Sequence, residues 1–165
     1  MDVNFEKAEN DWSPLIGRFI VDFVVIDDTM FHVIGSNSRR LNDKELDEIK
    51  EFKPRVKLFK KVMKTYLEPI DLAKLDKVMT KISDLYPIRN LLAHNSLTFA
   101  YEPIANGNLK PVGFQINGRK TGRSINITEL KKKAKELASI RIHFSELSMA
   151  YYEAEFRLIS QATKA

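Results

Sequence analysis

Apolar residues recur at helical spacing along this chain, and this periodicity limits the fold more than any other feature. In residues 13–34 two apolar rows run side by side. The first row is Leu15, Phe19, Phe23, Ile26, Met30 and Val33, and the second is Ile16, Ile20, Val24, Phe31 and Ile34. Ser13 suits an N-cap, Pro14 suits the first helical position, and Gly35 supplies a stop. The pattern predicts a helix whose apolar surface exceeds one core face, which favours packing on two sides, including a partner chain.

Two further helices are predicted in the middle of the chain. Asn42 and Glu45 form a capping box for the second helix, which Pro54 kinks or interrupts. Its continuation has an apolar side formed by Val56, Phe59, Val62, Met63 and Tyr66. The third helix is expected from about Asp71, and Pro87 predicts a kink or a restart near its end.

The pattern changes after residue 97. Residues 98–127 contain two Asn-Gly dipeptides and many β-branched and aromatic residues, which predict a small hairpin or three-stranded insertion. A second capping box, Asn126 with Glu129, then begins the longest helix. Its predicted buried stripe is Leu130, Ala134, Leu137, Ile140, Phe144, Leu147 and Tyr151. We therefore expect an all-α helical bundle with a small β-hairpin insertion before the last long helix, in a single domain spanning 1–165.

Composition narrows the classes of function. The chain of 165 residues has a net charge of +5 and a pI near 9.3, which favours an anionic partner, with nucleic acid first. It contains no Cys, so disulfides and thiolate metal sites are excluded. The three His residues lack the spacing of metal ligands, and we expect neither a metal nor another cofactor.

The N-terminal sequence and the longest apolar stretch bear on location. The start, MDVNFEKAENDW, is acidic and polar, unlike a secretory signal. The apolar stretch LIGRFIVDFVVIDDTMFHVIG carries four charged residues, which argues against a membrane span. We expect a cytoplasmic protein with no membrane partner.

One short segment, YPIRNLLAHNS at residues 86–96, combines candidate catalytic groups. It places four residues between Arg89 and His94, and Asn90 is the first of these four. In a purely structural interpretation, the segment closes a helix: His94 at the C-terminus interacts well with the helix dipole, and Asn95 suits a left-handed cap. The alternative is that the segment forms part of an active site.

The segment IRNLLAHNS resembles the R-N-x-x-x-H motif of the HEPN superfamily, which comprises small all-α domains that are often ribonucleases of toxin–antitoxin and phage-defence systems. LIGRFIVDFVVIDDTMFHVI is similar to the first helix of that family, and Asp27 stands where its acidic residue is expected. The resemblance implies catalytic roles for Arg89, Asn90 and His94 and a supporting role for Asp27. It also implies a homodimer with a composite site, and a cognate antitoxin protein as a partner.

One feature departs from a well-known branch of the family. In that branch the motif ends His-x-Tyr, and a partner nucleotidyltransferase modifies the Tyr to silence the toxin. Here Asn95 and Ser96 follow the His, so this form of control is not expected.

Metal-free RNA cleavage needs a base for the 2′-hydroxyl, an acid for the leaving 5′-oxygen, and positive charge near the transition state. His94 suits the first two tasks, and Arg89 suits the third. Asn90 lies at i, i+4 from His94, so its amide is placed to orient the imidazole. Arg89 lies roughly 140° around the helix from His94, at about 100° per residue, and a twofold dimer would bring the missing groups into one cleft.

Basic residues that follow an RNA backbone are also predicted. They are Lys53, Lys57, Lys60, Lys61 and Lys64 on one helix side, then Arg119, Lys120 and Arg123 in a turn, with a further run at Lys131–Lys135. The alternative is that these runs are solvated helix and loop faces.

Two hypotheses follow. The first is a metal-independent endoribonuclease of the HEPN type, a toxin or defence effector that cleaves RNA at a homodimer interface. The second is a non-catalytic HEPN-like module that binds nucleotide, RNA or a protein partner.

Overall fold

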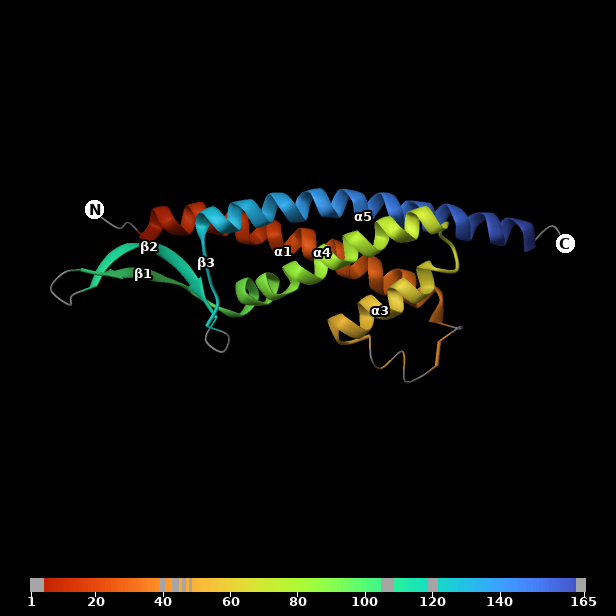
Figure 1. Ribbon diagram of the computed structural model, residues 1–165, viewed down its shortest axis with the longest axis horizontal. Helices are drawn as coiled ribbons and strands as arrows, with labels where there is room; N and C mark the ends of the chain where they lie inside the picture. The colour runs from red at the N-terminus through yellow and green to blue at the C-terminus, as the bar shows by residue number, and fades with distance from the viewer. Residues whose placement is uncertain are drawn as a thin grey trace. The chain divides into compact units, whose positions relative to one another are not determined.

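The computed structural model describes residues 5–38, 41–42, 45, 47, 49–104, 109–118 and 122–162. Its helices are α1 (Phe5–Ser36), α3 (Phe52–Met63), α4 (Pro69–His94) and α5 (Ile127–Ala162) (Figure 1). Between α4 and α5 lie β1 (Leu97–Pro103), β2 (Leu109–Asn117) and β3 (Ser124–Asn126). The expected fold class, mostly helical with a small β insertion before the last long helix, is confirmed.

Residue contacts group the chain into two compact units. Unit 1 comprises Met1–Asp22 and Leu85–Ala138, and unit 2 comprises Phe23–Asp84 and Ser139–Ala165. The strands belong to unit 1, and α3 belongs to unit 2. That the whole chain is one domain stays a prediction.

Unit 2 is held together by aromatic side chains from different helices. The ring of Phe23 on α1 lies 5.8 Å from that of Phe52 on α3, and Phe59 lies 5.5 Å from Phe144 on α5.

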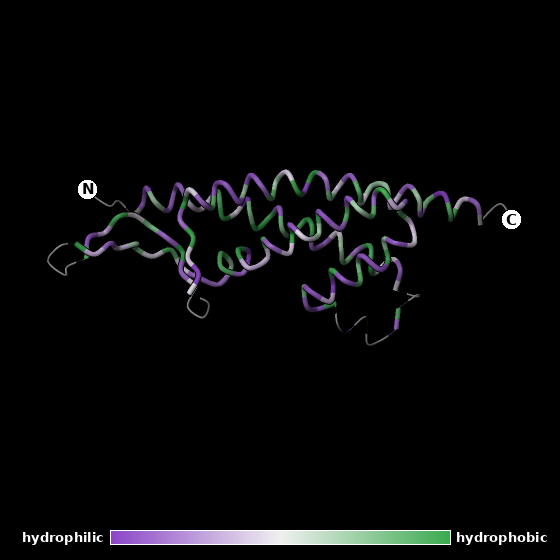
Figure 2. Tube along the Cα trace, viewed as in Figure 1, coloured by the Kyte–Doolittle hydropathy of each residue, from purple (hydrophilic) through white to green (hydrophobic). Residues whose placement is uncertain are grey.

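Hydrophobic and hydrophilic positions alternate along α5 (Figure 2). Every residue of its predicted stripe, from Leu130 to Tyr151, is buried, as the helical period requires.

A buried polar network also joins elements of unit 2. Asn37, directly after α1, donates a hydrogen bond to the hydroxyl of Tyr151 at 2.7 Å. The hydroxyl of Tyr66 in turn donates to Oδ1 of Asn37 at 2.7 Å. Asn37 is only 5% exposed, so these bonds satisfy polar groups that burial would otherwise leave unpaired.

The predicted start of the first helix is wrong. Instead of beginning at Ser13, α1 begins at Phe5 and continues through Pro14. Ala8 and Trp12 are buried, at 8% and 2% exposure. Burying a Trp side chain is worth about 4–6 kcal/mol by its area, whereas a Pro inside a helix costs about 3 kcal/mol. The gain from Trp12 therefore exceeds the cost of Pro14. The expected end at Gly35 is correct to one residue.

The middle helices differ from the prediction at their prolines. Asn42 and Glu45 form the expected capping box, with reciprocal bonds of 3.2 and 2.9 Å. The helical segment is then interrupted, and α3 begins at Phe52. Pro54 falls in the first turn of α3, where its missing N–H is no loss. The restart considered at Pro87 does not occur, because α4 continues through it to His94.

The sheet matches the predicted segment except that β1 begins one residue earlier, at Leu97. Its strands run antiparallel in the order β1-β2-β3. Leu97 pairs with Ile116, which in turn pairs with Ile125. Ile116 and Ile125 are buried, so this end of the sheet contributes to the core of unit 1. Residues 105–108, with the first Asn-Gly dipeptide, lie outside the described part of the chain.

Among the described residues, no helix is both long enough and apolar enough to cross a membrane.

Candidate functional site

The candidate catalytic residues lie in the last two turns of α4, within unit 1. Leu91 and Leu92 are buried and anchor this end of the helix. Arg89 and Asn90 are half-buried, and His94 is exposed as the last residue of α4. The motif therefore combines two half-buried polar groups with an imidazole that is exposed to solvent.

The hydrogen bonds of the motif differ from the expected pattern. Nη1 of Arg89 donates to Oδ1 of Asn90 at 3.2 Å. No described residue forms a hydrogen bond with His94, so Asn90 contacts the guanidinium and not the imidazole. One copy of the chain thus brings Arg89 and Asn90 together and leaves His94 separate.

The end of α4 is also capped differently from the prediction. Nδ2 of Asn95 donates to the carbonyl oxygen of Leu91 at 2.9 Å. Asn95 does not have the positive φ of a left-handed cap. Its side chain satisfies one of the helix's last carbonyls in place of a backbone turn. The hydrogen bond that caps this helix end therefore comes from Asn95 and not from His94.

The proposed supporting residue, Asp27, lies in unit 2 and forms an ion pair with Arg55. Arg55 is 5% exposed, and it also donates to the carbonyls of Ile49 at 2.8 Å and Lys50 at 3.0 Å. Its guanidinium carbon lies 3.9 Å from the centre of the Phe31 ring. This arrangement gives Asp27 a structural task, because a buried guanidinium without a counter-charge is costly.

Sequence reasoning missed Arg55, although a signal was present. Residue 55 lies on the apolar side of α3 with Phe52, Phe59 and Val62, at spacings of three, seven and ten residues from residue 52. A charged residue in a buried stripe requires a partner. The identity of that partner depends on which helix packs against α3.

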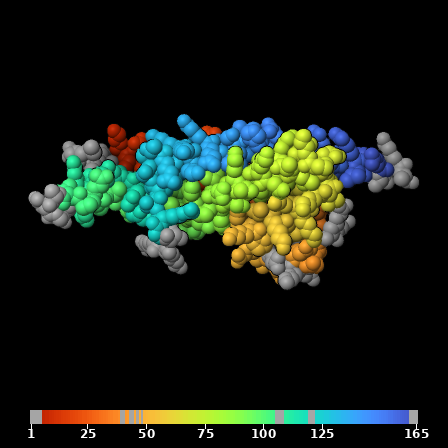
Figure 3. Space-filling view, in the orientation of Figure 1, coloured from red at the N-terminus to blue at the C-terminus, as the bar shows by residue number. Residues whose placement is uncertain are grey.

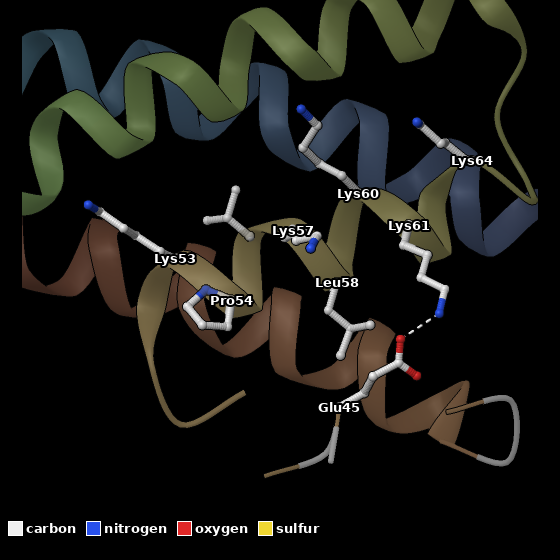
Figure 4. Close-up of a pocket in the computed structure, with 9 residues that line it drawn as sticks. Glu45, Lys53, Pro54, Lys57, Leu58, Lys60, Lys61 and Lys64 are labelled. Atoms are coloured by element: carbon white, nitrogen blue, oxygen red, sulfur yellow. Dashed lines mark hydrogen bonds and ion pairs between the residues drawn. The ribbon is translucent and has the colours of Figure 1, made fainter. Parts of the chain in front are cut away.

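All five predicted lysines line one pocket, which lies wholly in unit 2; four of them are on α3, and Lys64 directly follows it. The pocket has a volume of about 510 Å³, and α3 is at the surface on the face that Figure 3 shows. Its lining consists of the five lysines with Glu45, Pro54, Val56 and Leu58 (Figure 4). Lys57 lies between Lys53 and Lys64 in this view. The row of five lysines therefore forms part of the wall of this pocket.

Two of these lysines are already paired with carboxylates. Nζ of Lys61 lies 2.5 Å from Oε1 of Glu45, and Nζ of Lys60 lies 2.6 Å from Oδ1 of Asp76 on α4. The hydrogen bond from Lys61 is the main reason that the pKa of Glu45 lies below its usual value, and the backbone N–H of Asn42 lowers it further. Within the described chain, Lys53, Lys57 and Lys64 form no ion pair.

The second predicted basic group is only partly described. Arg119 and Lys120 lie outside the described residues. Arg123 is exposed, and its carbonyl accepts a hydrogen bond from the N–H of Gly118 at 2.7 Å. The residues of the Lys131–Lys135 run are mostly exposed on the first turns of α5.

The sheet carries a group of aromatic residues that sequence reasoning did not single out. Phe99 of β1 pairs with Phe114 of β2, and their rings lie 4.8 Å apart. Phe99 is 37% exposed and Tyr101 is 53% exposed. The signal in the sequence was the spacing of Phe99 and Tyr101, because residues two apart on a strand lie on the same face of the sheet.

Among the described residues, no group of three or more His, Asp or Glu side chains is arranged to hold a metal ion.

No family model, no curated protein and no solved structure matches this chain. The HEPN resemblance therefore rests on the residues themselves, and the activity that it implies is a proposal.

Proposed function

We propose that this protein is a metal-independent endoribonuclease of the HEPN type, with Arg89, Asn90 and His94 as its catalytic residues. One observation carries the proposal. At the end of α4, Arg89 is held by Asn90 while His94 remains exposed and free of hydrogen bonds to described residues. A general base must stay accessible to its substrate, and the exposed imidazole of His94 meets that requirement.

The chemistry follows from these groups. His94 in its neutral form accepts the proton of a ribose 2′-hydroxyl, whose oxygen attacks the adjacent phosphorus. The bond to the 5′-oxygen breaks, and that oxygen takes a proton from a protonated imidazole. The products are a 2′,3′-cyclic phosphate and a free 5′-hydroxyl. Arg89 stabilises the negative charge on the phosphoryl oxygens during this step.

A homodimer supplies the groups that one copy lacks. Acid and base act at opposite sides of the phosphorus, so two imidazoles are more suitable than one. In unit 1, α1 leaves apolar side chains accessible: Val21 is 60% exposed, and Ile16 and Ile20 are half-buried. Exposed apolar surface of this kind supports self-association through a twofold interface.

The biological setting is part of the same proposal. The resemblance favours a cytoplasmic toxin or defence effector, with a cognate antitoxin protein as a partner. The basic surface favours RNA as its substrate.

The test is cleavage of a mixed-sequence RNA in the presence of a chelator. His94→Ala should abolish cleavage. His143→Ala is the matched control, because His143 is also exposed on a helix and its Nδ1 contacts the carbonyl of Ser139 at 2.8 Å. Equal cleavage by His94→Ala and the wild type would refute the proposal.

A second candidate is a non-catalytic module that binds RNA or nucleotide. The lysine-lined pocket favours it, because that pocket provides positive charge without requiring the motif. Binding of RNA with no cleavage of any RNA tested, by a folded dimer, would support this candidate over the first.

A further inference from the structure

The four lysines of α3 and Lys64, which caps its C-terminus with helical backbone angles, occupy one side of the helix but are spread along its axis. At about 100° per residue they fall within an arc of about 100°. From Lys53 to Lys64 the helix rises about 16 Å, at 1.5 Å per residue. The ammonium groups of these two residues lie at opposite ends of the row, with Lys57 between them (Figure 4). The charges thus form a line along the pocket.

The lysines are not equivalent. Lys60 and Lys61 each contact a carboxylate, so each of these ion pairs has no net charge. A phosphate that approaches Lys61 also approaches Glu45 and is repelled by it. Glu45 and Asp76 belong to the same chain as the lysines and are always present beside them, whereas a phosphate ligand must bind from solution. Lys53, Lys57 and Lys64 have no such competitor within ion-pair distance among the described residues.

We propose that this pocket binds the phosphate backbone of an extended single-stranded RNA through Lys53, Lys57 and Lys64. Glu45 and Asp76 compete with the phosphates for Lys61 and Lys60, and they limit the contact to three charges. The choice of RNA rests on the proposed function. The line of three charges rests on the geometry of α3, and the competition from two carboxylates rests on the ion pairs that Glu45 and Asp76 form with it.

The length of the line decides between an extended and a compact ligand. A nucleotide or a short polyphosphate concentrates its charge and reaches one or two of the three free lysines, because their row extends about 16 Å. A strand presents one phosphate per nucleotide and reaches all three. The apolar lining of Pro54, Val56 and Leu58 accommodates sugar and base carbon atoms. It contains no described aromatic residue, so little base preference is expected.

The test measures binding to a labelled single-stranded DNA by fluorescence anisotropy over a range of salt concentrations. DNA lacks the 2′-hydroxyl and cannot be cleaved, so this result is independent of any ribonuclease activity. Three phosphate contacts predict a slope of log K against log salt of about −2 for a single strand. Loss of one contact in Lys57→Ala should reduce it to about −1.4.

Substitutions of the two carboxylates test the inference more stringently, because they should strengthen binding and not weaken it. Glu45→Gln keeps the capping box, because Gln serves in that position, and it releases Lys61. The slope should then steepen to about −2.8, with tighter binding. Asp76→Asn should act in the same way through Lys60. Lys60→Ala and Lys61→Ala should leave the slope near −2.

Three results would overturn the inference. The first is a Lys61→Ala slope that falls as far as that of Lys57→Ala. The second is a Glu45→Gln variant, folded by circular dichroism, with unchanged affinity and slope. The third is competition by inorganic tripolyphosphate at the same concentration of phosphate groups as the strand, which would assign the pocket to a compact ligand. Failure of RNA cleavage with these binding results intact would refute only the proposed function.

Discussion

Arg89 and Asn90 are neighbours in sequence, yet their side chains form a hydrogen bond of 3.2 Å between Nη1 and Oδ1. Adjacent residues on a helix ordinarily point about 100° apart and do not contact one another. The long Arg side chain must therefore bend around the helix to reach the amide. This bond restrains the guanidinium, and under the proposed function that restraint would reduce the entropy lost when Arg89 contacts a phosphate.

Arg89→Ala should lower the turnover of RNA cleavage by about 100- to 1,000-fold, the usual loss for one electrostatic donor to a transition state. RNA binding should weaken much less, because the lost contact is strongest in the transition state. Arg89→Lys should also be impaired, since an ammonium lacks the planar fork. Single-turnover cleavage and separate binding measurements check this prediction. Arg157→Ala, at an exposed site on α5, is the control.

Mixing two inactive variants should restore activity if the site is composite. Arg89→Ala and His94→Ala homodimers each lack one kind of group, whereas a mixed dimer retains one copy of each. Cleavage should therefore reappear after the two variants are mixed and allowed to exchange subunits, at a rate below that of the wild type because the mixed dimer has one imidazole instead of two. Sedimentation at micromolar concentration should show a dimer. A monomer at that concentration, or a mixture as inactive as its parts, would contradict the composite site.

Asp27→Ala should destabilise the fold. It leaves the Arg55 guanidinium buried without its counter-charge, which costs about 3 kcal/mol, at the lower end of the range for broken buried pairs because Asp27 is 28% exposed. Urea denaturation measures the change. Asp27→Asn should cost less, since its amide oxygen still accepts a hydrogen bond. Loss of cleavage by Asp27→Ala with unchanged stability would instead support the supporting catalytic role expected from the sequence.

Alkaline pH should weaken the fold through Tyr151. Burial, and then the nearby Glu155, raise the pKa of this hydroxyl in the folded state. A raised pKa means that the folded state holds the proton more tightly than the unfolded state. Stability from this group is therefore complete below the unfolded value of about 10, and it is lost as the pH rises above that value.

The comparison with Tyr151→Phe isolates this contribution. Phe cannot ionise, so the variant should lose less stability between neutral and strongly alkaline pH. At neutral pH it should be less stable by about 1 kcal/mol, because Asn37 then loses one hydrogen-bond acceptor. Equal alkaline losses in the two proteins, measured by urea denaturation, would exclude a role for this hydroxyl.

Local patterns in the sequence located the last helix, the capping box before α3 and the strands. Helical spacing predicted the buried stripe of α5, the capping box placed Asn42 against Glu45, and the loss of helical period placed the strands. These features depend on residues within a few positions of one another, and local spacing reports them directly. The motif at the end of α4 was visible for the same reason.

Which charged side chains are paired depends on how the helices pack, and local sequence patterns do not show it. Asp76 contacts Lys60, and Asp27 contacts Arg55 from 28 residues earlier in the chain. The length of α1 was likewise decided by burial of Trp12, which outweighs the break expected at Pro14. The physical reason is common to these cases. A local pattern indicates that a side chain is charged or apolar, but the energy of that side chain depends on the partner that packing brings to it from a distant part of the chain.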